Sequence, residues 1–268
     1  MNIVFDIGGT NMRVASAEGT TLGEIKKVPT PQSLDETIQT LAIIAKELSK
    51  GAIERAAGCI PGQIDALRGV YDANNRKLWL GRHFDVELFE ALGAPVQVEN
   101  DCSIIGLGEY TEGAGKGSHN MAYITVSTGV GIGHIVDGKI VPIGDLLFGH
   151  ELVDGEELEQ LISGTAVKKK FGIEPKELES IDERNKLADI LARGLVKVAE
   201  KWQPDTIVLG GSMIVGVNPI PVDRVQKTLA NLVQHPPTVK MAELKDNGGL
   251  VGAAILASQY GVKIDATH

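Results

Sequence analysis

The chain has 268 residues, of which 43% are hydrophobic and 23% charged, and its formal net charge is −9. This composition is typical of ordinary globular domains, and an acidic balance in which no Lys/Arg run forms a binding stripe argues against a nucleic-acid-binding surface. No apolar run reaches the roughly 18 residues that a membrane span needs. Cys59 and Cys102 lack C-x-x-C spacing, and Met1 leaves no room for a signal peptide before the first predicted strand, so a cytoplasmic location is expected.

The first part of the chain has the pattern of a three-stranded meander followed by a helix. Ser33 and Glu36 have the spacing of a capping box, and an apolar stripe at helical spacing continues to Leu48. A loop-rich insertion is predicted at 74–82, and a second helix at 102–111. Alternating apolar residues predict strands at 3–6, 13–17, 22–28, 56–60 and 96–99.

After a glycine-rich joint at 113–117, the chain repeats this pattern. Strands are predicted at 121–127, 131–136, 139–141 and 206–209, and helices at 156–162, 184–201 and 249–260. Asp137-Gly138 is a hairpin-turn sequence. A ββαβα-like unit used twice predicts an α/β protein with two mixed-sheet lobes, 1–112 and 113–268, and a cleft between them. The helix at 249–260 is a candidate addition to the first lobe.

Two glycine-rich hairpins, at 5–14 and 126–133, have the chemistry of phosphate-binding turns. Glycine permits positive φ and a close approach of ligand to backbone, and free N–H groups and hydroxyls can surround an anion. An ordinary glycine turn is the structural alternative for each hairpin. Asp6, at the end of the first strand, is expected to position a hydrated Mg²⁺. The predicted nucleotide contacts are Asp6, Gly8, Gly9, Thr10, Asn11, Thr128, Gly129 and Gly131.

Two other nucleotide motifs are excluded by their context. The G-x-G-x-G run at 129–133 is followed by a predicted strand, whereas a dinucleotide fingerprint requires a helix there. Gly115-Lys116-Gly117-Ser118 imitates a P-loop, but the earlier glycine of that motif falls at Tyr110.

Glu99-Asn100-Asp101 stands between a predicted strand and a predicted helix. Asn100 or Asp101 can serve simply as the helix N-cap. Alternatively, Asp101 is a general base, whose ionised form is favoured near a helix N-terminus. Phosphoryl transfer depends mainly on positioning and charge neutralisation, so an ordinary carboxylate suffices, and the residues alone leave both roles open.

Further polar and glycine-rich positions are ambiguous in the same way. Residues 149–151 and Glu159 form a polar group around a predicted helix start, which could hydrogen-bond sugar hydroxyls or simply be the surroundings of a solvated acidic helix at 154–159. No cysteine lies near them to build a zinc site. Gly210 and Gly211 could accommodate a purine or ribose, or form a plain turn after a strand.

The order of these motifs resembles the ROK family of sugar kinases and sugar-responsive repressors. The resemblance covers nearly the whole chain and implies a two-lobed, actin-like ATPase (ribonuclease H-like) fold with ATP and Mg²⁺ as cofactors. It also implies that Asp101 is the base that activates the 6-hydroxyl of a hexose, and that Glu159 binds the sugar near C1 and C2. It rests on residues 6–10, 61–62, 99–101, 127–133, 149–150 and 209–212. The implied sugar contacts are Gly62, Asn75, Asn100, Asp101, His150 and Glu159.

Two departures from the family pattern stand out. The family usually places a cysteine-rich zinc loop between its Gly-His and the following Glu, but here eight residues without cysteine separate His150 from Glu159. A structural zinc is therefore not expected, and Asp154-Gly155 is expected to form a shortened turn. Where the family often has Glu three residues before the His, this chain has Leu147, with Asp145 and Glu151 as candidate replacements.

The resulting expectation is an ATP-dependent hexose kinase, with glucose as the first candidate substrate. Fructose, mannose, allose, N-acetylglucosamine and N-acetylmannosamine are alternatives, as is a non-catalytic sugar-binding protein. A repressor would need a DNA-binding helix-turn-helix, for which Met1-Asn2 leaves no room before the first strand. The expected partners are a sugar and ATP, without nucleic acid or membrane, and the family suggests a homodimer.

Overall fold

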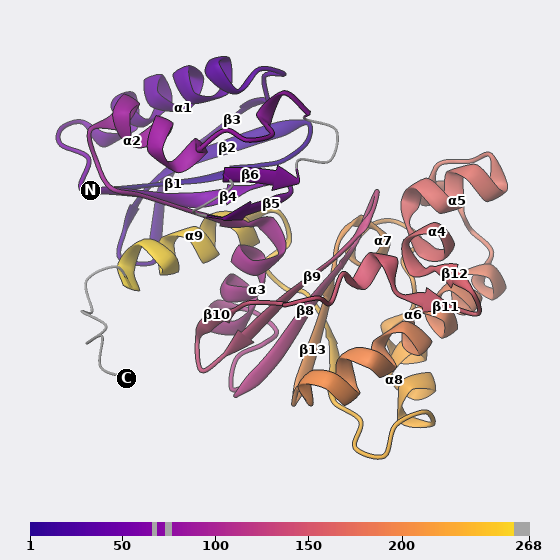
Figure 1. Cartoon of the computed structure of the whole chain (residues 1–268). Coiled ribbons are helices and arrows are strands. Elements are labelled where there is room, and N and C mark those ends of the chain that lie inside the picture. Colours follow the sequence, from indigo (N-terminus) through magenta and orange to yellow (C-terminus); the bar gives the residue numbers. More distant parts are fainter. Residues whose placement is uncertain (66–68, 73–76, 260–268) are drawn as a thin grey trace. The chain divides into compact units, whose positions relative to one another are not determined.

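The computed structural model describes residues 1–65, 69–72 and 77–259. The chain divides into two compact units. Unit 1 comprises residues 1–108 and the segment from Asp246 onwards, and unit 2 comprises residues 109–245. The sequence places the boundary after residue 112, whereas the chain passes from unit 1 to unit 2 within helix α3, Asp101–Glu112 (Figure 1).

Unit 1 is built on a five-stranded mixed sheet in the order β3-β2-β1-β4-β7. β1, β2 and β3 form the predicted antiparallel meander, and β4 and β7 continue the sheet as parallel strands beside β1. The strands predicted from alternation are confirmed as β1 Asn2–Ile7, β2 Asn11–Glu18, β3 Thr21–Pro29, β4 Arg55–Ile60 and β7 Val96–Asn100.

Helices cover both faces of this sheet (Figure 1). The Ser33 hydroxyl accepts a hydrogen bond from the Glu36 N–H at 3.2 Å, which confirms the predicted start of α1. α1 and α2 lie on one face, where Trp79 stacks on Phe84 and the Phe5 ring contacts Phe84 at a tilt, and α9 lies on the other. The sequence did not predict α2 or the short β5–β6 hairpin before it. The bounds are α1 Leu34–Ser49, β5 Gln63–Asp65, β6 Gly69–Asp72, η1 Lys77–Trp79, α2 Phe84–Leu92 and α9 Gly248–Gln259.

Unit 2 repeats the topology of unit 1. Its sheet has the order β10-β9-β8-β13-β14, again with three antiparallel strands followed by two parallel ones. The predicted duplication is therefore confirmed and extends to a fifth strand, β14, which the sequence analysis missed. The bounds are β8 Asn120–Val126, β9 Val130–Val136, β10 Lys139–Val141, β13 Thr206–Gly210 and β14 Thr238–Met241.

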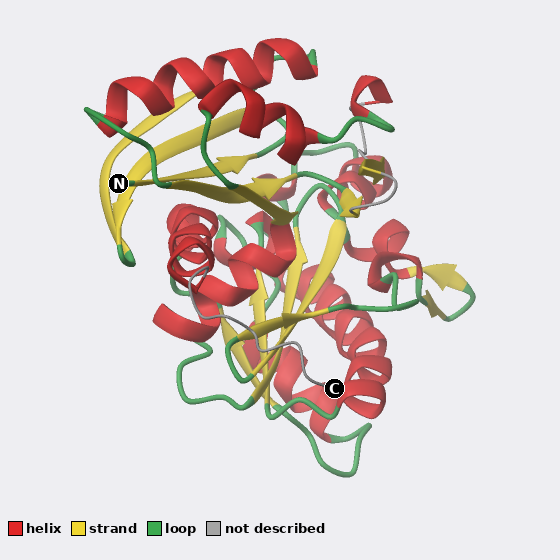
Figure 2. Cartoon of the chain, turned by 60° about the vertical axis from the view of Figure 1, so that its left-hand side comes forward, coloured by secondary structure: helices red, strands yellow, loops and turns green. Residues whose placement is uncertain are grey.

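The connection between β10 and β13 carries α4, α5 and α6 (Figure 1). Figure 2 distinguishes the helices, strands and loops of the chain by colour. The prediction of a helix over 156–162 was wrong at its start, because 156–157 pair with 152–153 in a small hairpin. Asp154 and Gly155 form its turn with φ of 56° and 89°, as expected for a shortened turn. α5 and α8 were also missed. The bounds are η2 Phe148–His150, β11 Leu152–Val153, β12 Glu156–Glu157, α4 Leu158–Ile162, α5 Gly164–Phe171, η3 Pro175–Glu177, α6 Ile181–Trp202, α7 Ser212–Val215, α8 Val222–Ala230 and η4 Lys245–Asn247.

Each unit has its own apolar core. In unit 1 the core lies between the sheet and α1, and in unit 2 it lies against α4 and α6. Gly194 of α6 lets that helix approach α4 closely, because an added Cβ would lie 2.8 Å from Leu158 Cδ2. None of the helices in the described part of the chain combines the length and apolarity needed to cross a bilayer.

Candidate active site

The first predicted phosphate turn, residues 8–10, joins β1 to β2. The Gly8 N–H donates to the Asn11 carbonyl at 2.9 Å, which closes the turn. Thr30, at the end of β3, braces it twice: its N–H donates to the Thr10 carbonyl and its hydroxyl to the Gly8 carbonyl, both at 2.9 Å. Gly9 and Thr10 are exposed, and a Cβ added at Gly9 would meet no heavy atom within 4 Å. The tip of this turn is therefore open to a ligand.

Asp6 lies at the base of this turn, at the carboxyl end of β1. Its Oδ2 accepts from Arg13 Nη1 at 3.1 Å, and its Oδ1 from the Cys59 thiol at 3.3 Å. Arg13 is held in turn by Asp246, next to the start of α9. Gly249 brings α9 so close that an added Cβ would lie 2.6 Å from Asp6 Cγ. Gly249 thus allows a close approach of α9 to Asp6, and Arg13, Cys59 and Gly249 are site neighbours that the sequence patterns did not indicate.

The second element of the unit 1 site follows β7, whose carboxyl end lies two strands from that of β1. Asn100 Nδ2 donates to the Gly62 carbonyl at 2.6 Å, and its Oδ1 accepts from the Cys102 N–H at 2.9 Å. Asn100 is therefore the N-cap side chain of α3 and at the same time fixes Gly62, whose φ of 102° requires glycine. Asp101 Oδ1 also accepts from the Cys102 N–H, at 2.8 Å.

Asp6, Gly62, Asn100 and Asp101 gather because β1, β4 and β7 are parallel neighbours in the sheet. The carboxyl ends of such strands form one edge, which is the usual ligand-binding edge of an open α/β sheet. Burial raises the pKa of Asp101, and the charge of Asp6 adds to the effect, while hydrogen bonds involving Cys102 act in the opposite direction. A carboxylate shifted in this way is a stronger base than one in water.

The second predicted phosphate turn, residues 127–129, joins β8 to β9 in unit 2. The Ser127 N–H donates to the Gly129 carbonyl at 2.8 Å. The start of α5 braces the turn, because the Gly164 N–H donates to the Ser127 carbonyl at 2.6 Å and the Thr165 hydroxyl to the Thr128 carbonyl at 2.7 Å. The Thr128 side chain is exposed, and Gly131 belongs to β9, opposite Thr125.

Glu159 of α4 connects this turn to the His150 region. Its Oε2 accepts from the Val130 N–H at 2.7 Å. A Cβ added at Gly129 would lie 2.6 Å from the same oxygen, and one added at Gly149 would lie 3.4 Å from it. The carboxylate implied to bind the sugar is therefore also part of the support of the second phosphate turn.

Gly210 ends β13, beside the end of β8, and Gly211 is the N-cap residue of α7. Packing alone accounts for both glycines, since an added Cβ would lie 2.3 Å from the Tyr123 hydroxyl at Gly210 and 2.3 Å from the Val126 carbonyl at Gly211. Ser212 follows them, and its hydroxyl lies 3.1 Å from that of Ser127. The structure thus brings the β13 end and the second phosphate turn together, and a nucleotide contact at these glycines stays a prediction.

The segment after β10 places His150 on the surface of unit 2, at the end of η2. Its Nδ1 lies 3.3 Å from Glu157 Oε1, so Glu157 is the acidic partner of His150. Asp145 and Glu151, the candidates from sequence, instead form ion pairs with Lys201 and Lys197 of α6. Sequence spacing could not identify Glu157, because the β11–β12 hairpin returns the chain to His150.

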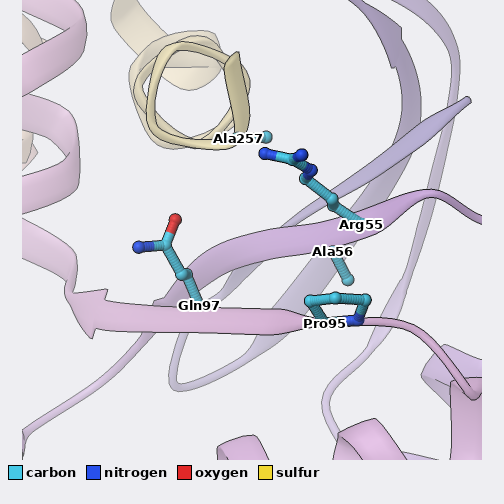
Figure 3. A pocket seen from close by; sticks show the side chains of 5 residues that line it. All are labelled: Arg55, Ala56, Pro95, Gln97 and Ala257. Atoms are coloured by element: carbon cyan, nitrogen blue, oxygen red, sulfur yellow. The ribbon is translucent and has the colours of Figure 1, made fainter. Parts of the chain in front are cut away.

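Asn75, the remaining predicted sugar contact, lies outside the described residues. Within residues 1–65, 69–72 and 77–259, no three His, Cys, Asp or Glu side chains are grouped closely enough to hold a metal ion. Both cysteines are buried in unit 1, in β4 and α3. A small pocket lined by Arg55, Ala56, Pro95, Gln97 and Ala257 lies between β4, β7 and α9, but none of the predicted site residues contributes to it (Figure 3).

Several proteins of known sequence are similar to this chain. An uncharacterized protein of Clostridium perfringens is 31% identical over 62% of the chain and 64% of its own length. The bifunctional enzyme NanE/NanK of Brucella melitensis is 29% identical over 96% of the chain and 54% of its own length. The chain thus spans less than two thirds of these two relatives. The glucokinase of Streptomyces coelicolor is 27% identical over 97% of the chain and 98% of its own length.

Solved structures are similar over nearly their whole length. A ROK hexokinase from Thermus thermophilus has a TM-score of 0.84 and 25% identity, covering 97% of this chain and 99% of that one. A ROK family glucokinase from Streptomyces griseus, solved with glucose and AMPPNP, has a TM-score of 0.79 and 26% identity, covering 96% and 99%. Because the match to the ROK family extends over residues 2–260, the chain belongs to the ROK family and has the α/β, actin-like fold of its sugar kinases.

Proposed function

We propose that this protein is an ATP-dependent sugar kinase that phosphorylates the 6-hydroxyl of a hexose, with glucose as the first candidate. The observation that carries the proposal is Asp101, which stands at the ligand-binding edge of the unit 1 sheet and whose pKa is raised by burial. Its neighbours Asn100 and Gly62 are fixed by one hydrogen bond and offer contacts for sugar hydroxyls. The similarity to a glucokinase solved with glucose and AMPPNP supports this assignment.

In the proposed reaction, Asp101 accepts the proton of the sugar 6-hydroxyl. The freed oxygen lone pair attacks the γ-phosphorus of ATP, the bond between that phosphorus and the β–γ bridging oxygen breaks, and ADP leaves. The turns at 8–10 and 127–129 supply N–H groups and hydroxyls for the phosphates. His150 and Glu159 of unit 2 are proposed sugar contacts.

Asp6 fits the role of a carboxylate that holds the hydration shell of Mg²⁺. Mg²⁺ in kinases is commonly bound by one or two carboxylates together with substrate phosphates and water, so a full protein cage is not required. Each Asp6 oxygen accepts one hydrogen bond from the protein, which leaves further lone pairs for water. The ion, when bound, neutralises charge on the transferred phosphoryl group.

The proposal is tested by measuring ADP formation with MgATP and each of glucose, mannose, fructose, allose, N-acetylglucosamine and N-acetylmannosamine. Sugar-dependent ADP formation with the phosphate on the 6-oxygen is the expected result. Absence of turnover with all six sugars, while isothermal titration still detects sugar binding, would instead support a non-catalytic sugar-binding protein. A cytoplasmic location and a homodimer stay predictions.

A further inference from the structure

Helix α6 presents three cations in a row. Arg193, Lys197 and Lys201 are four residues apart, so they lie on one face of the helix. At 1.5 Å per residue, the row extends over about 12 Å. Each of the three is paired with an acid of the segment between β10 and α4, residues 145–157, here termed the 145–157 segment.

The pairing has a consistent direction. Arg193 Nη2 lies 2.8 Å from Asp154 Oδ2. Lys197 pairs with Glu151, and Lys201 with Asp145. As the residue number rises along the helix, the number of the partner falls, so the 145–157 segment runs antiparallel to α6. The three consecutive pairs therefore define the register of the segment along the helix.

The 145–157 segment has little regular structure to hold it otherwise. It contains one turn of 3₁₀-helix and two strands of two residues each. The buried side chains of Leu146, Phe148 and Val153 anchor it in the core. Between these anchors, His150 is exposed, whereas Glu151 is largely covered and pairs with Lys197 of α6.

The middle pair contains the most buried of the three acids, Glu151, although Lys197 itself is 55% exposed. The side chain of Glu151 is only 17% exposed, whereas those of Asp145 and Asp154 are 89% and 71% exposed. Exposed ion pairs contribute little because water and salt screen them. The Lys197–Glu151 pair is less screened and stands next to His150 in the chain.

Glu151 also connects α6 to the pair His150–Glu157, where the sugar is proposed to bind. Its carbonyl accepts from the Leu158 N–H at 2.8 Å, which fixes the start of α4 and thereby Glu157, the partner of His150. A displacement of Glu151 would therefore move His150 and Glu157 together.

We propose that Arg193, Lys197 and Lys201 are positioning residues for the acceptor sugar, with Lys197 the most important, and that they act by holding the 145–157 segment in place. The proposal rests on the proposed function in one respect, that His150 contacts the sugar. It predicts that acceptor binding depends on salt through pairs that do not themselves touch the substrate.

The test compares Lys197→Met with the wild type. The KM for the sugar is expected to rise about two- to fivefold, with kcat and the KM for ATP unchanged, because one partly buried ion pair is lost. Lys197→Arg keeps the charge and should restore the wild-type sugar KM. Raising the salt concentration should increase the sugar KM of the wild type but have less effect on Lys197→Met.

Arg224→Met is the matched control. Arg224 of α8 forms two hydrogen bonds of 2.7 Å with Asp189 of α6, whose carboxylate also accepts from the Thr228 hydroxyl of α8. Its loss removes an ion pair from the same helix and should leave the sugar KM unchanged. If both variants raise the sugar KM equally, α6 pairs act only through general stability and the proposal is wrong.

A second readout does not depend on activity. The amides of His150 and Glu151 donate to the carbonyls of Leu147 and Phe148 at 2.8 and 3.3 Å, so their hydrogen exchange reports on the order of the segment. Hydrogen exchange at these amides should accelerate in Lys197→Met. It should return to the wild-type rate in the double variant that combines Lys197→Glu with Glu151→Lys. Unchanged exchange in Lys197→Met would overturn the proposal, even if no sugar is turned over and the proposed function fails.

Discussion

The two phosphate turns have the same sequence character and are supported in different ways. The turn at 8–10 is braced by Thr30, the residue that directly follows β3 of the same sheet. The turn at 127–129 is braced by helices, through Glu159 of α4 and Thr165 of α5. Duplication of a fold therefore preserves the hairpin but not its support, and the second turn has become coupled to the residues proposed to bind sugar.

The difference extends to the glycines of the two turns. A Cβ at Gly9 has free space around it, so packing within the protein does not explain glycine there. Gly129 is closely packed against Glu159. We therefore infer that Gly9 serves a ligand and that Gly129 serves the fold. The four predictions below test this contrast between the units.

The largest effect is expected from Asp101→Asn, because the proposed proton transfer belongs to unit 1 alone. Turnover should fall roughly 10²- to 10⁴-fold, since Asn cannot accept the proton. In the wild type, kcat/KM should rise with pH through the raised pKa of Asp101, and this acid limb should be absent from any residual activity of the variant. Steady-state ADP release across pH 5 to 9 measures the fall in turnover and the pH dependence of kcat/KM. Sugar-dependent turnover that survives the substitution would show that Asp101 is not the base.

Stability gives Asp101→Asn an internal control. A carboxylate whose folded pKa is raised stabilises the fold fully below its unfolded pKa and loses that contribution as pH rises through the folded pKa. Replacing Asp101 by neutral Asn should therefore leave the free energy of unfolding at neutral pH unchanged or higher. A strongly destabilised variant in urea denaturation would mean that lost activity reports on folding instead of proton transfer.

The next effect in size is expected from Gly9→Ala. The added methyl group meets no protein atom, so the melting temperature should stay within about 1–2 °C of the wild type. Turnover should fall by up to about 100-fold if the methyl group displaces the phosphates by about 1 Å. Calorimetry and ADP release measure the two quantities, and full activity in this variant would show that the first turn does not contact the nucleotide.

Gly129→Ala should give the opposite profile. The methyl group overlaps Glu159 Oε2, and relieving that overlap should lower the free energy of unfolding by about 1–3 kcal/mol. Because Glu159 must move, the KM for the sugar should rise along with the KM for ATP. Chemical denaturation and initial-rate kinetics test this, and a stable variant with an altered KM for ATP alone would contradict the coupling.

The smallest effects are expected from the two threonine braces. Thr30→Val removes the hydroxyl from a buried position, where the Gly8 carbonyl loses its partner, and should destabilise the protein by about 1 kcal/mol. Thr165→Val acts at an exposed residue, where water can replace the lost hydrogen bond, and should have less effect. Urea denaturation of the two variants compares their free energies of unfolding. Equal decreases would show that burial does not distinguish the two hydrogen bonds.

Much of the fold follows from local sequence patterns. The two meanders, the Ser33 cap and the paired glycine-rich turns depend on residues that are neighbours in the chain, and the structure confirms these elements. α5 and β14 were missed because eight and four residues carry too little periodicity to be distinguished from loop. The start of α4 was misplaced because Glu156 and Glu157 suit a helix locally, yet pair across a hairpin.

By itself, the sequence determined the chemistry that is available: a carboxylate before a helix, open glycine turns and a histidine followed by acids. Only the tertiary structure decided which of these groups meet. Strand order places Asp6 and Asp101 along one sheet edge. The β11–β12 hairpin makes Glu157 the acidic partner of His150. Asp145 and Glu151 instead form ion pairs with lysines of α6. Such pairings connect residues far apart in the chain, and they depend on packing and topology that no local pattern records.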